Sequence, residues 1–298
     1  MKGFIMFVIT GASGNIGKII TEKLLAEGKK VKVFARHKEK LATLEKLGAE
    51  MVVGDLGDSV FLAKTFSGAE AVFTMLPMEM NVTNVQAHQD RIGGSIAKAV
   101  AESGVTAVVN LSSMGAHLPA GTGPILGLHR LEEGLNAIAN LNVLHLRPAY
   151  FMENLFSNIG MIKNMGIAGS PIRADMKIAQ IATRDIGVHA ALRLLKKDFQ
   201  GKQVQELLGQ RDLSMEEVIG ILGKAIGKPE LNYVQFPYAD ALAGMTSMGM
   251  SPSLAESYIE MSKGFNENIL GVVNRNAGNT TPTSIEDFAP IFAEAFNA

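Results

Sequence analysis

Three glycines near the start of the sequence are spaced for binding a phosphate group. Gly11, Gly14 and Gly17 stand between an apolar run and a helical pattern. In such a loop the first glycine makes a tight turn, the second lets the backbone approach a pyrophosphate, and the third lets the helix pack close to the sheet. The N–H groups at the helix start then face the anion. The spacing predicts a pyrophosphate of NADP(H) or NAD(H), or alternatively a turn without a ligand. The residues of the predicted site are Gly11, Ala12, Ser13, Gly14, Asn15, Ile16 and Gly17.

An arginine at the end of the next apolar run bears on which dinucleotide binds. Arg36 stands where an acidic residue would accept a hydrogen bond from the ribose 2′-hydroxyl of NAD(H), and Lys40 follows one helical turn later. A guanidinium can instead pair with two oxygens of a 2′-phosphate. The two residues therefore favour NADP(H), with NAD(H) as the alternative cofactor. A solvated charge at a strand end is the other interpretation of Arg36.

The elements that must position these residues alternate between short apolar runs and helical patterns. Parallel strands need crossover helices, and continuous apolar runs suit strands that are buried on both faces. The pattern predicts an α/β fold with a doubly wound parallel sheet, the Rossmann fold, whose ligand crevice lies at the carboxyl ends of the strands. Strands are expected at residues 4–9, 31–35, 50–53, 71–75, 107–111 and 143–146, and helices at residues 16–28, 38–47, 59–66, 84–103 and 128–139.

The alternation loosens after residue 150. We expect a dinucleotide-binding domain over residues 1–150 and a smaller, mainly helical cap or substrate domain over residues 151–298, with some segments returning to the main sheet. Ser214 and Glu217 form the pattern of a capping box. The methionines of the cap suit an apolar substrate, or they belong to an ordinary core. Helices are expected at residues 152–165, 184–195, 214–226, 238–248, 251–264 and 284–297, and strands at residues 178–183 and 203–208.

The composition excludes several classes of function. Of the 298 residues, 47% are apolar and 19% are charged, which favours a well-buried core, and the net charge of −1 gives no attraction to nucleic acid or an anionic membrane. With no cysteine and no histidine pair at metal-ligand spacing, we expect no disulfide, thiolate or metal site. No apolar stretch approaches the roughly 18 residues of a membrane span. We therefore expect a soluble cytoplasmic protein with a small-molecule partner.

The chain resembles the NmrA-like branch of the atypical short-chain dehydrogenase/reductase superfamily. The resemblance implies an NAD(P)-binding Rossmann fold. The residues that carry it are the glycine loop, Phe34-Ala35-Arg36, Gly54-Asp55-Leu56, Gly68-Ala69-Glu70-Ala71-Val72-Phe73, Asn110-Leu111-Ser112-Ser113, Leu146-Arg147-Pro148-Ala149-Tyr150-Phe151-Met152-Glu153-Asn154 and Thr183-Arg184-Asp185-Ile186-Gly187.

The resemblance also implies roles for individual residues. Asp55 and Leu56 would flank the adenine, although Asp55 could be a turn residue. The turn of Met75, Leu76 and Pro77 would pass under the ribose and nicotinamide, although Pro77 could simply end a strand. Two more residues, Pro148 and Tyr150, would border the nicotinamide, and Asn154 would begin the wall of the substrate pocket.

The proton-transfer pair of the superfamily is missing. Its reductases use Tyr-x-x-x-Lys, but the fourth residue after each of the four tyrosines is Asn, Pro, Leu or Ser, and no lysine lies between Ser112 and Arg147. Ser112 and Ser113 occupy the place of the family's active-site serine. His129 stands near the missing pair, and an imidazole can transfer a proton at neutral pH. Helix-cap or turn roles are the alternative for all three residues.

Two functions are compatible with this pattern. The first is an NAD(P)H-dependent oxidoreductase that passes a hydride to a small apolar acceptor, such as a quinone, without the Tyr-x-x-x-Lys pair. The second is a non-catalytic NADP(H) redox sensor that changes its contact with a protein partner. We expect the first.

Overall fold

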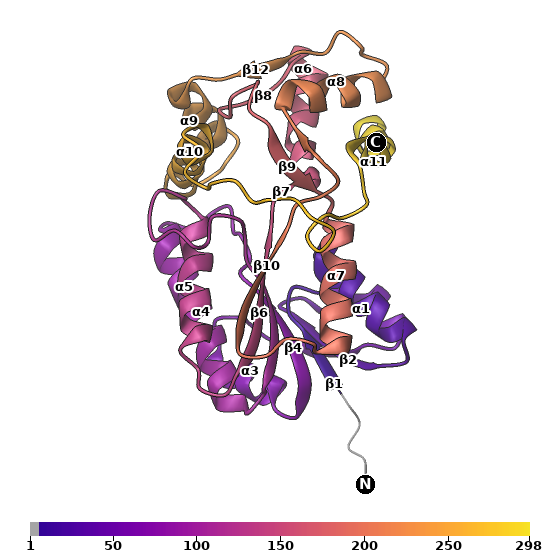
Figure 1. Cartoon of the computed structure of the whole chain (residues 1–298), viewed down its shortest axis with the longest axis vertical. Helices are drawn as coiled ribbons and strands as arrows, with labels where there is room; N and C mark the ends of the chain where they lie inside the picture. The colour runs from indigo at the N-terminus through magenta and orange to yellow at the C-terminus, as the bar shows by residue number, and fades with distance from the viewer. Residues whose placement is uncertain (1–5) are drawn as a thin grey trace.

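A seven-stranded parallel sheet forms the centre of the computed structural model, which describes residues 6–298 (Figure 1). Its spatial order is β10-β6-β5-β4-β1-β2-β3, so the chain reverses direction across the sheet between β1 and β4. This confirms the predicted doubly wound fold; residues 4 and 5 of the first predicted strand lie outside the described residues. The strands are β1 (Met6–Ile9), β2 (Lys30–Ala35), β3 (Glu50–Val53), β4 (Ala69–Met75), β5 (Ala107–Leu111), β6 (Asn142–Pro148) and β10 (Lys202–Leu207).

Helices cover both faces of this sheet because its strands alternate apolar side chains toward each face. On β1, Phe7 and Ile9 belong to the core beneath α1 (Asn15–Ala26) and α7 (Thr183–Lys196). Val8 belongs to the core on the opposite face, where α3 (Ser59–Phe66), α4 (Val85–Ser103) and α5 (Ile125–Asn136) lie. Burial on both faces explains the continuous apolar runs of the sequence.

Three predicted helices differ most from the observed elements, and the one expected at residues 152–165 is divided into the 3-10 helix η2 (Met152–Asn158) and the short α6 (Ile159–Met165). The helix expected at residues 128–139 is α5, which begins three residues earlier, directly after Pro124. The fixed φ of proline suits the start of a helix. The helix expected at residues 38–47 is divided into a 3-10 turn, η1 (Lys38–Leu41), and the short α2 (Ala42–Lys46).

The second half of the chain forms a smaller layer above the carboxyl ends of the strands (Figure 1). It has its own core, to which Met152, Val218, Leu222 and Phe292 contribute. The predicted capping box is present, since the Ser214 hydroxyl and the Glu217 carboxylate each accept the other's backbone N–H. The helices are η2 (Met152–Asn158), α6 (Ile159–Met165), α8 (Met215–Ala225), α9 (Tyr238–Ser247), α10 (Pro252–Asn266) and α11 (Ile285–Asn297), and the strands are β7 (Tyr150–Phe151), β8 (Ala168–Ser170), β9 (Ile178–Ile181), β11 (Asp212–Leu213) and β12 (Tyr233–Gln235).

After residue 150 the chain also returns to the main sheet. Strand β10 pairs with β6 as the edge strand, and α7 packs beside α1. The two small sheets of the upper layer, β11-β9-β7 and β12-β8, were not expected from the sequence in full, since only β9 had a predicted strand. Their strands have four residues or fewer, too short for a clear alternation of side chains. The division at residue 150 into two domains stays a prediction.

Candidate functional site

The glycine loop is packed too tightly for side chains at two of its three glycines. Gly11 has a φ of +63°, and a Cβ there would lie 2.9 Å from the sulfur of Met75. At Gly17 a Cβ would lie 2.3 Å from the carbonyl oxygen of Gly11, so this glycine lets α1 approach the loop. Gly14 differs, because its Cβ would stand 3.4 Å from the same oxygen, an ordinary contact. The missing side chain of Gly14 therefore leaves room for a ligand and is not required for packing within the loop.

The start of α1 fits an anion. Its N-cap is Gly14, which has no side chain to accept from the first N–H groups of the helix, and no acidic residue stands in the first turn. Ser13, Gly14 and Asn15 are exposed. Unpaired N–H groups and the positive end of the helix dipole face the space outside the carboxyl end of β1.

Arg36 lies at the carboxyl end of β2 but pairs with a carboxylate. Its Nη1 is 2.9 Å from Oε1 of Glu79, on the segment between β4 and α4. Lys40 lies in η1 and is exposed. Glu79 was missed in the sequence because a single acidic residue in a connecting segment belongs to no motif.

Asp55 forms the turn that its alternative interpretation describes. Its Oδ1 accepts the backbone N–H of Gly57 at 2.7 Å. The guanidinium of Arg91, on α4, lies directly against this turn, since a Cβ at Gly57 would be 1.8 Å from Nη1 of Arg91. Leu56 packs partly buried against the core of that face. Contact of Asp55 and Leu56 with an adenine stays a prediction.

A cavity of about 430 Å³ lies at the carboxyl ends of β4, β5 and β6, beneath the upper layer. Met75 touches Gly11 of the loop and also lines this cavity, so the two sites are continuous. Of the residues with predicted roles, the cavity lining includes Met75, Leu76, Ser112, Ser113, Pro148, Tyr150 and Asn154.

Pro77 and His129 are the two predicted residues near the cavity that are not part of its lining, although Leu128 is. Most of the remaining lining is apolar. From the upper layer and the connecting segment after α10 come Met176, Ile178, Tyr258, Met261, Phe265, Leu270 and Val273.

Two tyrosines line the cavity, and their hydroxyls have no hydrogen-bond partner among the described residues. Tyr150 begins β7, two residues after the end of β6, and Tyr258 lies on α10. Burial, and then the neighbouring Tyr233 and Tyr258, hold the pKa of Tyr150 far above its usual range. Burial also raises the pKa of Tyr258. Both phenols therefore stay protonated at neutral pH and can donate a hydrogen bond to a ligand.

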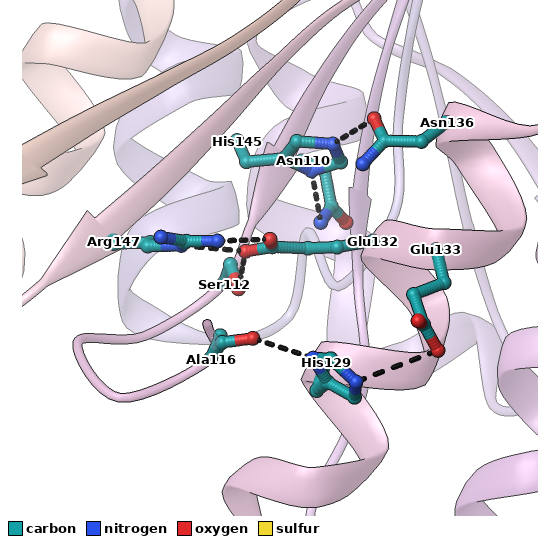
Figure 2. Close-up of polar contacts among 9 residues, drawn as sticks. All are labelled: Asn110, Ser112, Ala116, His129, Glu132, Glu133, Asn136, His145 and Arg147. Carbon is teal, nitrogen blue, oxygen red and sulfur yellow. Dashed lines mark hydrogen bonds and ion pairs between the residues drawn. The ribbon is translucent and has the colours of Figure 1, made fainter. Parts of the chain in front are cut away.

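Ser112 is already engaged in a buried network (Figure 2). Its hydroxyl donates to Glu132 of α5. The same carboxylate accepts hydrogen bonds from both Nε and Nη2 of Arg147, at 3.0 and 2.5 Å. The exposed fractions of the Glu132 and Arg147 side chains are 5% and 13%. Ser113 donates instead to the carbonyl of Met114 at 2.9 Å.

His129 points from α5 toward the loop that carries Ala116 (Figure 2), and it is not part of the cavity lining. Its Nδ1 is 2.8 Å from the carbonyl oxygen of Ala116, which only an N–H can satisfy. Its Nε2 stands 3.4 Å from the carboxylate of Glu133. Both ring nitrogens thus have protein groups beside them, and a role of His129 in proton transfer stays a prediction.

The family motif around residue 150 fastens the upper layer to the sheet. The carboxylate of Glu153 accepts the backbone N–H of Thr183 at 3.0 Å and also its hydroxyl at 2.5 Å. Asp185 in turn accepts the N–H and hydroxyl of Thr283, at 3.0 and 2.7 Å. The motifs that contain Glu153 and Asp185 thus join the segments around residues 153, 183 and 283. This role was not visible in the sequence.

A second polar chain runs beneath β4, β5 and β6. Thr74 donates to Asn110, whose amide donates to Nδ1 of His145 at 3.1 Å, and Nε2 of His145 is 2.9 Å from the side-chain oxygen of Asn136. This arrangement requires a neutral imidazole with its proton on Nε2. Burial lowers the pKa of His145 to about 4.

Because its pKa is lowered, His145 should make the protein less stable in mild acid. Between the folded pKa of about 4 and the ordinary histidine pKa of 6.5, the unfolded chain binds the extra proton. We expect His145 to lower the free energy of unfolding by about 2 kcal/mol from pH 8 to pH 5. Urea denaturation at both pH values measures it. His145→Asn should lose this part of the pH dependence, while His189, whose pKa burial also lowers, keeps its own; an unchanged pH dependence would contradict the assignment.

Two kinds of site are absent from the part of the chain that the structure describes. No group of three or more His, Asp or Glu side chains could hold a metal ion among residues 6–298. Over the same residues, no helix has both the length and the apolar character needed to cross a bilayer.

Comparison with known proteins finds similarity in sequence along nearly the whole chain. The sequence matches the NmrA-like family over residues 5–289. An NAD(P)H azoreductase from Xenophilus azovorans is 28% identical over 300 residues, covering 98% of this chain and 100% of the relative.

Solved structures show the same fold. An NADPH-dependent quinone oxidoreductase from Escherichia coli, complexed with NADPH, has a TM-score of 0.80 at 20% identity, covering 95% of this chain and 98% of that one. A triphenylmethane reductase from Citrobacter sp., complexed with NADP(H), has a TM-score of 0.78 at 17% identity, covering 97% and 100%.

Proposed function

Since the chain belongs to the NmrA-like family, we propose that it is an NADPH-dependent oxidoreductase for a small, largely apolar acceptor such as a quinone or an azo compound. The observation that carries the proposal is the continuity of the two sites. Met75 packs on Gly11 of the glycine loop and lines the apolar cavity. A dinucleotide anchored at the loop can therefore reach the cavity with its other end.

The chain's own residues would hold NADPH along this path. The uncapped start of α1 accepts the pyrophosphate, and the tight contact of Gly17 with Gly11 holds that helix in place. Arg36 and Lys40 are the cations for the 2′-phosphate. Met75, Leu76 and Pro148 border the nicotinamide end, where they line the cavity. When bound, NADPH supplies a hydride, and the relatives named for azo, quinone and dye reduction support this chemistry.

The cavity suits a flat, apolar acceptor. Its volume of about 430 Å³ lies within the range of about 300–1,000 Å³ that small-molecule pockets occupy. Its apolar walls exclude water and hold the acceptor in one orientation, so positioning supplies much of the rate. A small-molecule partner and the cytoplasmic location expected from the sequence belong to this proposal.

Tyr150 takes over part of the role of the missing Tyr-x-x-x-Lys pair. Its hydroxyl has no other partner among the described residues, and its raised pKa keeps it protonated. It can therefore donate a hydrogen bond to the oxygen or nitrogen on which negative charge develops during reduction. The proton that completes the reduction then comes from water.

We expect Tyr150→Phe to lower kcat/KM for the acceptor by about 10- to 100-fold, because one donor to developing charge is lost. The Kd of NADPH should change by less than about twofold. Steady-state kinetics and a fluorescence titration measure the two quantities. Tyr233→Phe is the matched control, since the Tyr233 hydroxyl is bonded to Ser170 and Ile172 outside the cavity. Wild-type kcat/KM in Tyr150→Phe would contradict the role.

Anaerobic oxidation of NADPH tests the function as a whole. The expected result is oxidation of NADPH, followed as loss of absorbance at 340 nm, with at least one member of a panel of quinones and azo compounds. The expected turnover number is on the order of 1–100 per second. Tight binding of NADPH without turnover across the panel would support the dinucleotide sensor instead.

A further inference from the structure

We propose that Glu79 sets the preference of this protein between NADPH and NADH by competing with the 2′-phosphate for Arg36. The inference rests on the proposed function, because it concerns the same dinucleotide site. It begins from the ion pair between Arg36 and Glu79, which joins the end of β2 to the segment between β4 and α4.

The ion pair places a carboxylate where the 2′-phosphate would bind. Nη1 of Arg36 is 2.9 Å from Oε1 of Glu79. The segment that carries Glu79 follows directly on Met75, Leu76 and Met78, all of which line the cavity. Glu79 therefore lies one residue beyond the cavity wall along the chain.

The pair is weak enough to be broken by a phosphate. The Arg36 side chain is 58% exposed and that of Glu79 is 31% exposed. Exposed ion pairs of this kind contribute about 0.2–1 kcal/mol. A phosphate dianion with charge-assisted bonds to two of the guanidinium nitrogens is the stronger partner, so NADPH can displace Glu79.

The displaced carboxylate has one other partner within reach. Nε2 of His88, on the first turn of α4, lies 4.0 Å from Oε2 of Glu79 and has no hydrogen-bond partner within residues 6–298. The His88 side chain is only 14% exposed. Glu79 can thus turn from Arg36 toward His88, but it remains a negative charge close to the phosphate and weakens NADPH binding. NADH has no 2′-phosphate and leaves the pair between Arg36 and Glu79 intact.

The test is a set of dissociation constants for NADPH, NADH and adenosine 2′,5′-bisphosphate. Glu79→Gln should tighten NADPH and the bisphosphate by about 5- to 20-fold and leave NADH within about twofold. Glu39→Gln is the matched control, since it removes the same charge from exposed η1, where the carboxylate lies near His37 and not Arg36. It should change NADPH binding by less than about twofold.

A double variant makes the test specific to the pair. In an Arg36→Met background, where NADPH binds weakly, Glu79→Gln should give a clearly smaller gain, because the competition for Arg36 is gone and only the direct repulsion between the carboxylate and the phosphate remains. An equal gain with and without Arg36, or an equal gain for NADPH and NADH, overturns the proposal. If the wild-type protein binds neither dinucleotide, the proposed function itself fails, which is a separate result.

Discussion

Replacing Glu132 by glutamine is expected to lower the free energy of unfolding by about 3–5 kcal/mol, because it leaves a buried guanidinium without its counter-charge. Arg147 places two nitrogens on this carboxylate and Ser112 adds its hydroxyl (Figure 2). The glutamine amide cannot accept all three bonds. Its NH₂ group would also face a cation. Denaturation by urea at pH 7.5 measures the loss.

The neighbouring residue of the same helix is the matched control. Glu133→Gln removes the same charge, but the Glu133 side chain is 67% exposed and its one ion-pair partner among residues 6–298 is His129, so this variant should cost less than about 0.5 kcal/mol. Replacing both buried partners, with Glu132→Leu and Arg147→Met together, should recover much of the loss, since no unpaired charge then remains. Equal effects of Glu132→Gln and Glu133→Gln would show that the network contributes nothing to stability.

Gly17→Ala is expected to weaken NADPH binding by at least about 100-fold. The clash is with backbone atoms, so a side-chain rotation cannot relieve it and α1 must move away from the loop. The new Cβ would lie 2.3 Å from the carbonyl oxygen of Gly11 and 2.8 Å from Cα of Ala12. Both atoms are backbone, so neither can rotate away. The start of α1 would then no longer face the pyrophosphate. A fluorescence titration with NADPH gives the Kd, and circular dichroism confirms that the chain is folded.

Gly94→Ala in α4 separates this effect from a general effect of alanine in a helix. No atom lies within 4 Å of the position of its Cβ, so the substitution should stabilise the protein by about 0.5–1 kcal/mol. NADPH should bind this variant as it binds the wild type. If Gly17→Ala also bound NADPH with unchanged affinity, the pyrophosphate would not lie at this loop.

The sequence by itself determined the sheet and the glycine loop, because both depend on local rules. A strand buried on two faces needs a continuous apolar run, and the run at β1 meets this need with Phe7, Val8 and Ile9. The loop depends on backbone approaches within seven residues, from Gly11 to Gly17. Such constraints can be seen in the residue types and their spacing.

Element bounds and short strands were only partly determined by the sequence. Strand β10 could be predicted as a strand, but its place at the edge beside β6 depends on pairing with residues more than fifty positions away. The pair β8 and β12 has three residues in each strand, too few for a periodic signal. Long-range pairing decides where such segments lie.

Only the tertiary structure decided which polar residues are free to act. Serine and histidine are residue types suited to catalysis. The Ser112 hydroxyl is hydrogen-bonded to Glu132, however, and the His129 ring is hydrogen-bonded to the carbonyl oxygen of Ala116. Tyr150 belongs to no catalytic motif, yet it lies at the cavity with a free hydroxyl. A polar group that a buried protein partner already binds is less available to a ligand, and such partners come from segments that the local sequence does not specify.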